Sequence, residues 1–116
     1  RFGLEKRLDR IIVTDPLSYL ELMSLTRNAR FVVTDSGGFQ KESYWAGKRG
    51  ILPMPQGGWQ EITDTGWHIL VKDVVDADWE SLFSNILEPF DYPANIFGDG
   101  KAAEKIVKTI GERIQL

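Results

Sequence analysis

The apolar positions of this 116-residue sequence form short runs that alternate with longer amphipathic segments. The short runs are rich in β-branched residues and predict buried strands at residues 10–14, 31–35, 50–54 and 68–71. Pro53 lies in the third run, and it either places that strand at a sheet edge or shortens it. Apolar residues recur at helical spacing over residues 17–28, 39–46, 76–87 and 101–114.

Local signals set the expected ends of these helices. Pro16 suits the first turn of the first helix, and Gly47 suits the position just after the second. Residues 55–66 predict an irregular loop with one helical turn. The last helix has an apolar stripe at the helical period, formed by Ala102, Ala103, Ile106, Val107, Ile110 and Ile114.

Strands and helices alternate with short connections, which favours an α/β fold with a Rossmann-like, doubly wound parallel sheet. The length suits a single domain over residues 1–116. The predicted sheet is small, and the first residue is Arg1 rather than methionine. We therefore expect a chain that is truncated at its N-terminus and lacks preceding strands.

Composition narrows the classes of function. The net charge is −3, from 14 basic and 17 acidic residues without a basic block, so we expect no nucleic-acid or membrane partner. There is no cysteine and one histidine, His68, which excludes thiolate catalysis and predicts no metal site. No apolar run approaches the ~20 residues that cross a bilayer, and no signal peptide is evident, so we expect a cytoplasmic protein.

The strongest chemical signal lies where the second predicted strand runs through Ser36, Gly37 and Gly38 into a helix. Glycines let backbone N–H groups approach an anion, and the start of a helix favours a phosphate. Glu42, about one turn later, could accept hydrogen bonds from a ribose diol. A plain capped turn with a solvated Glu42 explains the same residues, and the motif alone leaves both interpretations open. Neither a Walker loop nor a dinucleotide fingerprint is present.

Two aromatic or titratable side chains are further candidates. Trp59, in a glycine-bearing loop, could stack on a base or cover a pocket. The alternative, which the sequence favours, is that Trp59 and Trp67 anchor that loop to the core. His68 begins a predicted strand without a carboxylate or hydroxyl partner nearby in sequence, so we expect a structural role rather than an acid–base role.

Taken together and in order, these motifs resemble the C-terminal part of UDP-N-acetylglucosamine 2-epimerases. The resemblance covers the chain from about residue 10 onward and is carried by residues 15–22, 34–42, 47–48, 59–61, 66–67 and 98–102. It implies two Rossmann-like domains, as in the GT-B glycosyltransferases, with this chain as the UDP-binding half. It also implies a homodimer, a missing N-terminal domain and a place in polysaccharide biosynthesis.

The resemblance implies that UDP-N-acetylglucosamine and UDP-N-acetylmannosamine are interconverted by elimination and re-addition of UDP. No cofactor or metal is implied. Ser36, Gly37 and Gly38 match the diphosphate-binding positions, Glu42 the ribose position, and Leu22 a residue near the uracil. The acid–base residues of the family lie upstream, so we expect no catalytic residue in this chain and no activity from this chain alone.

The sequence departs from the family pattern around one loop. Met54 stands where many members have arginine, and Gly57 and Gly58 replace a Thr-Glu pair. Lys41 replaces a common acidic residue, whereas Trp59 is a familiar variant and joins the expected substrate-binding set. These changes leave two alternatives open: a GT-B glycosyltransferase, and a non-catalytic sugar-nucleotide sensor.

Overall fold

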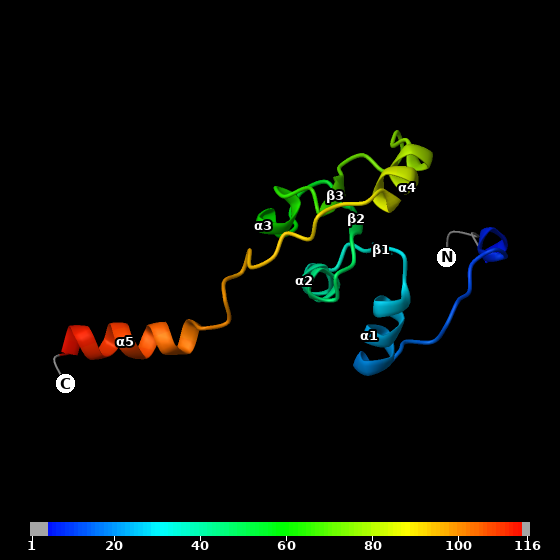
Figure 1. Cartoon of the computed structure of the whole chain (residues 1–116). Coiled ribbons are helices and arrows are strands. Elements are labelled where there is room, and N and C mark those ends of the chain that lie inside the picture. The colour runs from blue at the N-terminus through cyan, green and yellow to red at the C-terminus, as the bar shows by residue number, and fades with distance from the viewer. Residues whose placement is uncertain (1–4, 115–116) are drawn as a thin grey trace.

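The computed structural model describes residues 5–114, in which three short strands form one parallel sheet (Figure 1). In order across the sheet, the strands are β1 (Val32–Val33), β2 (Gly50–Pro53) and β3 (His68–Val71). Val32 pairs with Gly50 and Ile51 pairs with Ile69, so β2 is central. Pro53 is its last residue. Pro53 therefore shortens a central strand and does not place that strand at a sheet edge.

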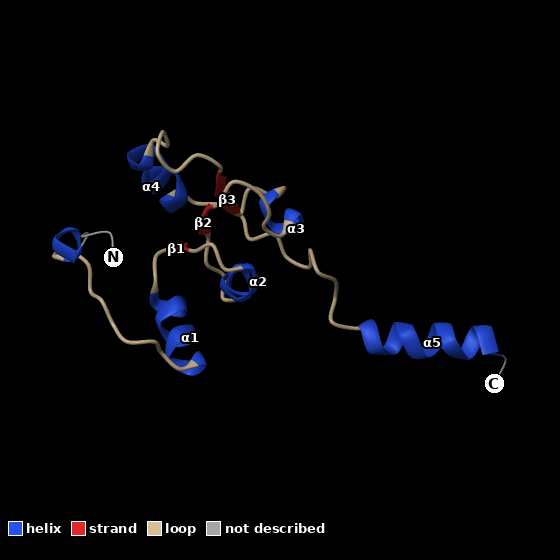
Figure 2. Cartoon of the chain, turned by 180° about the vertical axis from the view of Figure 1, so that it is seen from behind, coloured by secondary structure: helices blue, strands red, loops and turns tan. Residues whose placement is uncertain are grey.

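Helices cover both faces of this sheet. The described residues form the 3₁₀ helix η1 (Glu5–Leu8) and the α-helices α1 (Tyr19–Asn28), α2 (Gly37–Trp45), α3 (Gln60–Thr63), α4 (Trp79–Leu87) and α5 (Ala102–Ile114). α2 and α4 both contact β2, and Figures 1 and 2 show them on opposite sides of the strands. The predicted α/β class with a parallel sheet is confirmed.

The two faces bury separate apolar clusters because successive side chains of a strand point to opposite sides. On the α4 side, Ile51 packs with Val71 and Ile86. On the α2 side, Tyr44 of α2 packs with Ile62 and Trp67. The central strand contributes Ile51 to the cluster on the α4 side, and both Ile51 and Leu52 are completely buried.

Arg49, just before β2, joins the α4 side to the loop before β3. Its guanidinium donates hydrogen bonds to five carbonyl oxygens at 3.1–3.3 Å, those of Gly66, Trp67, Asn85, Ile86 and Glu88. Three of these residues lie at the end of α4, where carbonyls lack intrahelical partners. The guanidinium also lies 4.5 Å from the centre of the Phe90 ring. Arg49 therefore caps the C-terminal end of α4 and holds the loop after α4 and the loop before β3 in place.

The strand predicted at residues 10–14 is absent, and this prediction is wrong. Ile11, Ile12 and Val13 are 60%, 92% and 68% exposed in an extended segment. A strand needs a partner, and within residues 5–114 no strand pairs with this segment. The apolar run is compatible with a strand, but it does not provide the second strand with which it would have to pair.

The start of α1 also differs from the prediction. Pro16 lies outside the helix, which begins after Ser18. The backbone N–H and the hydroxyl of Ser18 donate to the Glu21 carboxylate at 2.9 and 2.6 Å. The hydroxyl bond, followed by the backbone bond, holds the pKa of Glu21 below its ordinary value. This local pairing at the helix start sets the boundary instead of the proline.

α5 stands apart from the other helices at the end of a long loop, and the molecule is elongated, with extents of 67 × 30 × 28 Å (Figure 2). The helix forms as predicted, but its apolar stripe is exposed along its length. Among the residues described, no helix is long and apolar enough to cross a membrane.

Replacing Arg49 with lysine should lower the free energy of unfolding by about 1–3 kcal/mol, because one ammonium cannot reproduce a fork of donors. Urea unfolding followed by tryptophan fluorescence measures the change. Arg30→Lys, at an exposed arginine before β1, is the control and should change stability by less than about 0.5 kcal/mol. Equal effects of the two substitutions would contradict the role given to Arg49.

Candidate functional site

The candidate site is the turn that connects β1 to α2 at the carboxyl edge of the sheet, where α/β proteins commonly bind ligands. Ser36 is the N-cap residue of α2, and its hydroxyl accepts a hydrogen bond from the Phe39 N–H at 3.4 Å. The Ser36 N–H in turn donates to the Thr34 hydroxyl at 3.1 Å. These bonds fix the direction in which the chain enters the helix.

Gly37 and Gly38 form the first two positions of α2 and are exposed. A Cβ at either position would meet no atom within 4 Å, so neither internal packing nor a positive φ requires glycine here. As the first two residues of a helix, both have N–H groups without an intrahelical acceptor. The turn therefore presents free donors at the positive end of the helix dipole, in open space that an anion can enter.

Trp59 lies beside this turn. Its indole Nε1–H donates to the Gly37 carbonyl at 2.8 Å. The Lys41 ammonium lies 3.3 Å from the centre of the indole ring, and the Phe97 ring approaches it edge-on with centroids 6.3 Å apart. Trp59 thus joins the loop before α3 to the first turn of α2, as the anchoring interpretation expects.

Gln40 is the buried partner that makes this arrangement possible, and the sequence did not identify it. Its Oε1 accepts from the Trp59 backbone N–H at 3.2 Å, and its Nε2 lies 3.5 Å from the Met54 sulfur. Gly58 has φ +88°, and a Cβ there would come within 3.2 Å of the Gln40 oxygen. The positive φ of Gly58 favours glycine there, and the close approach to Gln40 leaves little room for a side chain.

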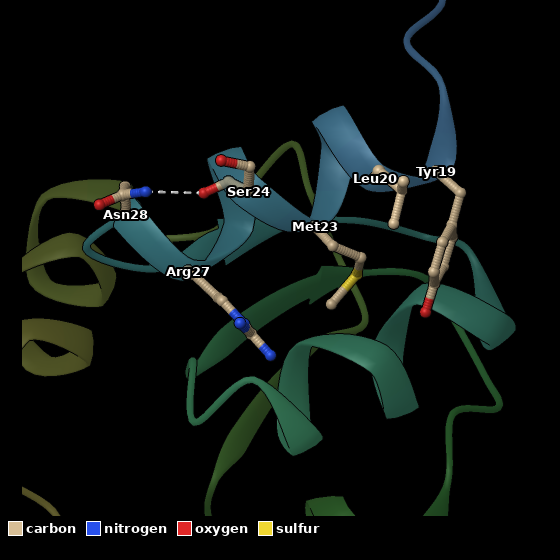
Figure 3. Close-up of a pocket in the computed structure, with 6 residues that line it drawn as sticks. All are labelled: Tyr19, Leu20, Met23, Ser24, Arg27 and Asn28. Carbon is tan, nitrogen blue, oxygen red and sulfur yellow. Dashed lines mark hydrogen bonds between the residues drawn. The ribbon is translucent and has the colours of Figure 1, made fainter.

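The other predicted site residues are less closely connected. Glu42 is half-buried on α2, and in the described part of the chain no hydrogen bond or ion pair engages its carboxylate. Leu22 is half-buried on α1. The groove on that helix, of about 340 Å³, is lined by other residues, namely Tyr19, Leu20, Met23, Ser24, Arg27 and Asn28 (Figure 3). The structure thus brings Trp59 to the Ser36–Gly38 turn, and shows no such link for Leu22 or Glu42.

Comparison with known proteins identifies the family of the chain. The sequence profile of UDP-N-acetylglucosamine 2-epimerases matches residues 3–111. The chain belongs to the UDP-N-acetylglucosamine 2-epimerase family. These comparisons favour neither a glycosyltransferase nor a sugar-nucleotide sensor.

Relatives and a solved structure of this family match nearly the whole chain. A UDP-2,3-diacetamido-2,3-dideoxy-D-glucuronate 2-epimerase from Pseudomonas aeruginosa is 30% identical over 97% of the chain and 31% of its own length. A UDP-N-acetylglucosamine 2-epimerase homolog from Methanococcus maripaludis is 33% identical over 90% of the chain and 29% of its own length. The structure of UDP-GlcNAc 2-epimerase from Methanocaldococcus jannaschii superposes with a TM-score of 0.70 at 31% identity, covering 92% of this chain and 30% of that one. The chain therefore spans about 30% of the length of these family members.

His68 has a structural position in this family member. It is 2% exposed, and its Nε2 lies 2.9 Å from the Gln40 carbonyl and 3.3 Å from the Ser43 hydroxyl. Because a carbonyl only accepts, Nε2 carries the proton and Nδ1 is bare. Nδ1 is buried without a partner among the described residues, and a Cβ on Gly50 would lie 3.2 Å from it. The ring fastens α2 to β3, so the structural interpretation is supported.

Stability should fall as the pH drops below about 6.5, the ordinary pKa of histidine. Burial lowers the pKa of His68, so below that pH the unfolded chain binds a proton that the folded chain does not. The stabilisation contributed by neutral His68 is complete above the pKa that His68 has in the unfolded chain. It is lost as the pH falls toward the lower pKa that His68 has in the folded chain. Urea unfolding at a series of pH values measures it.

The matched variant is His68→Gln, which keeps a donor near Nε2 but does not titrate. Since His68 is the only histidine in the sequence, the difference between the two pH profiles isolates its effect. Parallel profiles between about pH 5 and 6.5 would contradict the assignment of a neutral, buried imidazole.

Proposed function

We propose that the complete protein is a UDP-sugar 2-epimerase that interconverts UDP-N-acetylglucosamine and UDP-N-acetylmannosamine, and that this chain is its UDP-binding domain. Membership of the family supports the reaction. The observation that supports the site is the pair of exposed, unobstructed glycines at the start of α2. The family's reaction has an anionic leaving group, and the N-terminus of α2 offers backbone N–H donors that suit an anion.

The chemistry explains why such a turn matters. No carbonyl lies beside C2 of the sugar, so its proton is not acidic and direct abstraction is slow. Instead, the C1–O bond breaks, UDP leaves with the electron pair, and loss of the C2 proton forms a C1=C2 glycal. Re-addition of UDP to C1, with a proton delivered to the opposite face of C2, completes the inversion. Negative charge builds on the departing diphosphate, which donors fixed in advance stabilise best.

In this proposal different residues bind different parts of the ligand. The Ser36 hydroxyl and the N–H groups of Gly37 and Gly38 hold the diphosphate. The free carboxylate of Glu42 accepts from the ribose hydroxyls, and Leu22 packs near the uracil. The acid–base groups come from another part of the protein, as the family resemblance implies.

The wider setting follows from the same proposal. The chain forms one domain of a two-domain, GT-B-like protein, and the UDP-sugar binds between the domains. The complete protein is a cytoplasmic homodimer that requires neither a cofactor nor a metal and supplies sugars for polysaccharide synthesis.

A second candidate substrate has a specific observation in its favour. The Pseudomonas aeruginosa relative, matched over 97% of this chain, is named for a UDP-2,3-diacetamido-2,3-dideoxy-D-glucuronate. That sugar carries the same 2-acetamido centre, so the same elimination and re-addition apply. The two substrates differ at C3 and C6, away from the diphosphate held by this chain.

The complete protein should convert UDP-N-acetylglucosamine to UDP-N-acetylmannosamine, and the products should carry deuterium at C2 when the reaction is run in D₂O. Proton NMR of the anomeric signals measures both changes. The diacetamido-glucuronate substrate is assayed in parallel, and faster turnover of it identifies the sugar. UDP release that depends on an added acceptor sugar, without exchange at C2, would identify a glycosyltransferase instead.

Ser36→Asp should abolish UDP binding, because it places a carboxylate where the diphosphate lies. Aspartate is an excellent N-cap residue, so the helix should keep its stability to within about 0.5 kcal/mol. Isothermal titration with UDP measures binding, and thermal unfolding checks the fold. Ser36→Asn is the matched control, since asparagine also caps but carries no charge. If the Ser36→Asp and Ser36→Asn variants bound UDP with equal affinity, the proposal that the diphosphate lies at this turn would be wrong.

A further inference from the structure

The bond between the Trp59 indole and the Gly37 carbonyl is not demanded by burial. Trp59 is 37% exposed, so its N–H could bond to water at little cost. Instead it donates to Gly37 at 2.8 Å, a short distance for an N–H···O bond. An exposed indole that is held to one backbone carbonyl points to a role for that carbonyl.

The carbonyl of Gly37 and the N–H of Gly38 belong to one planar peptide group and point in opposite directions. Two consecutive glycines have the greatest backbone freedom of any pair. No other atom lies within 4 Å of the space where their side chains would be, so packing does not restrict them. Both residues belong to α2, so a hydrogen bond to this carbonyl adds to the helical geometry in holding the Gly38 N–H, which points away from Trp59 and outward from the helix start.

Trp59 is itself held in place by α2. Its backbone N–H donates to the side chain of Gln40, and its ring carries the Lys41 ammonium at 3.3 Å. Gly37, Gln40 and Lys41 all belong to the first turns of the same helix. Trp59 is thus held to α2 by its backbone N–H, its indole N–H and the face of its ring.

We propose that Trp59 is a positioning residue that orients the Gly38 N–H toward the phosphates of a nucleoside diphosphate, acting through the Gly37 carbonyl. The proposal rests on the proposed function, which places the diphosphate at this turn. It is an alternative to the hypothesis that Trp59 stacks on the base, and Lys41 occupies one face of the ring.

The two roles predict different dependence on the ligand. A residue that stacks on the base contributes equally to the binding of uridine and of UDP. A residue that orients the Gly38 N–H contributes only when phosphates are present. The phosphate dependence of a single substitution therefore separates positioning from direct contact.

The test is Trp59→Phe in the complete protein, with UDP and uridine as the two ligands. Phenylalanine keeps a ring beneath Lys41 but cannot donate to Gly37. We expect the affinity for UDP to fall about three- to tenfold, the value of one hydrogen bond, while uridine binding is unchanged. Isothermal titration measures both affinities.

Trp79→Phe is the matched control, because the Trp79 indole also donates to a backbone carbonyl, that of Val74, at 3.1 Å. It should change neither affinity. If Trp59→Phe is unstable, benzothienylalanine at position 59 removes the N–H and keeps the shape of the ring.

Unchanged UDP affinity in either Trp59 variant would overturn the positioning role while the wild type still binds UDP. An equal loss of uridine and UDP binding would also overturn it, in favour of direct contact with the nucleoside. Failure of the wild-type protein to bind UDP would instead overturn the proposed function, and the inference with it.

Discussion

The guanidinium of Arg49 is the contact on which the arrangement of the sheet depends most. It lies at the start of the central strand and reaches carbonyls at the end of α4 and in the loop before β3. Carbonyls at a helix end and in a loop lack the regular backbone partners of a helix or sheet interior. By satisfying them, Arg49 sets how β3 lies against β2 and how α4 covers Ile51. The carboxyl edge of the sheet, where the candidate site lies, is built on that arrangement.

At that edge the site is made by one helix and the loop that returns to it. α2 supplies the open turn at Gly37 and Gly38, and it also supplies Gln40 and Lys41, which hold the loop. Gly58 can approach Gln40 closely only because it has no side chain. The loop that contains Gly58 and Trp59 is therefore closely fitted to α2.

The sequence predicts well those features that depend on local pattern. The strands at 32–33, 50–53 and 68–71 were recognisable because strands in a parallel sheet covered on both faces are apolar throughout. The turn at Ser36 was recognisable because capping residues and glycines have local requirements. Residues 10–14 have the same composition as a strand, yet pairing depends on a partner that composition does not record. Gln40 was missed for a similar reason, since its partners are 14 and 19 residues away in sequence.

The burial of the single imidazole has a practical consequence for spectroscopy. Its ring protons give isolated NMR signals, because no other histidine contributes to that region of the spectrum. The ring contacts the Gln40 carbonyl and the Ser43 hydroxyl, both on α2, and it lies inside the fold away from the open turn. A change in those signals on titration with a nucleotide would therefore report a shift of the helix against the sheet rather than contact with the ligand. The His68 signals therefore measure whether binding of a ligand at the start of α2 displaces the rest of the helix.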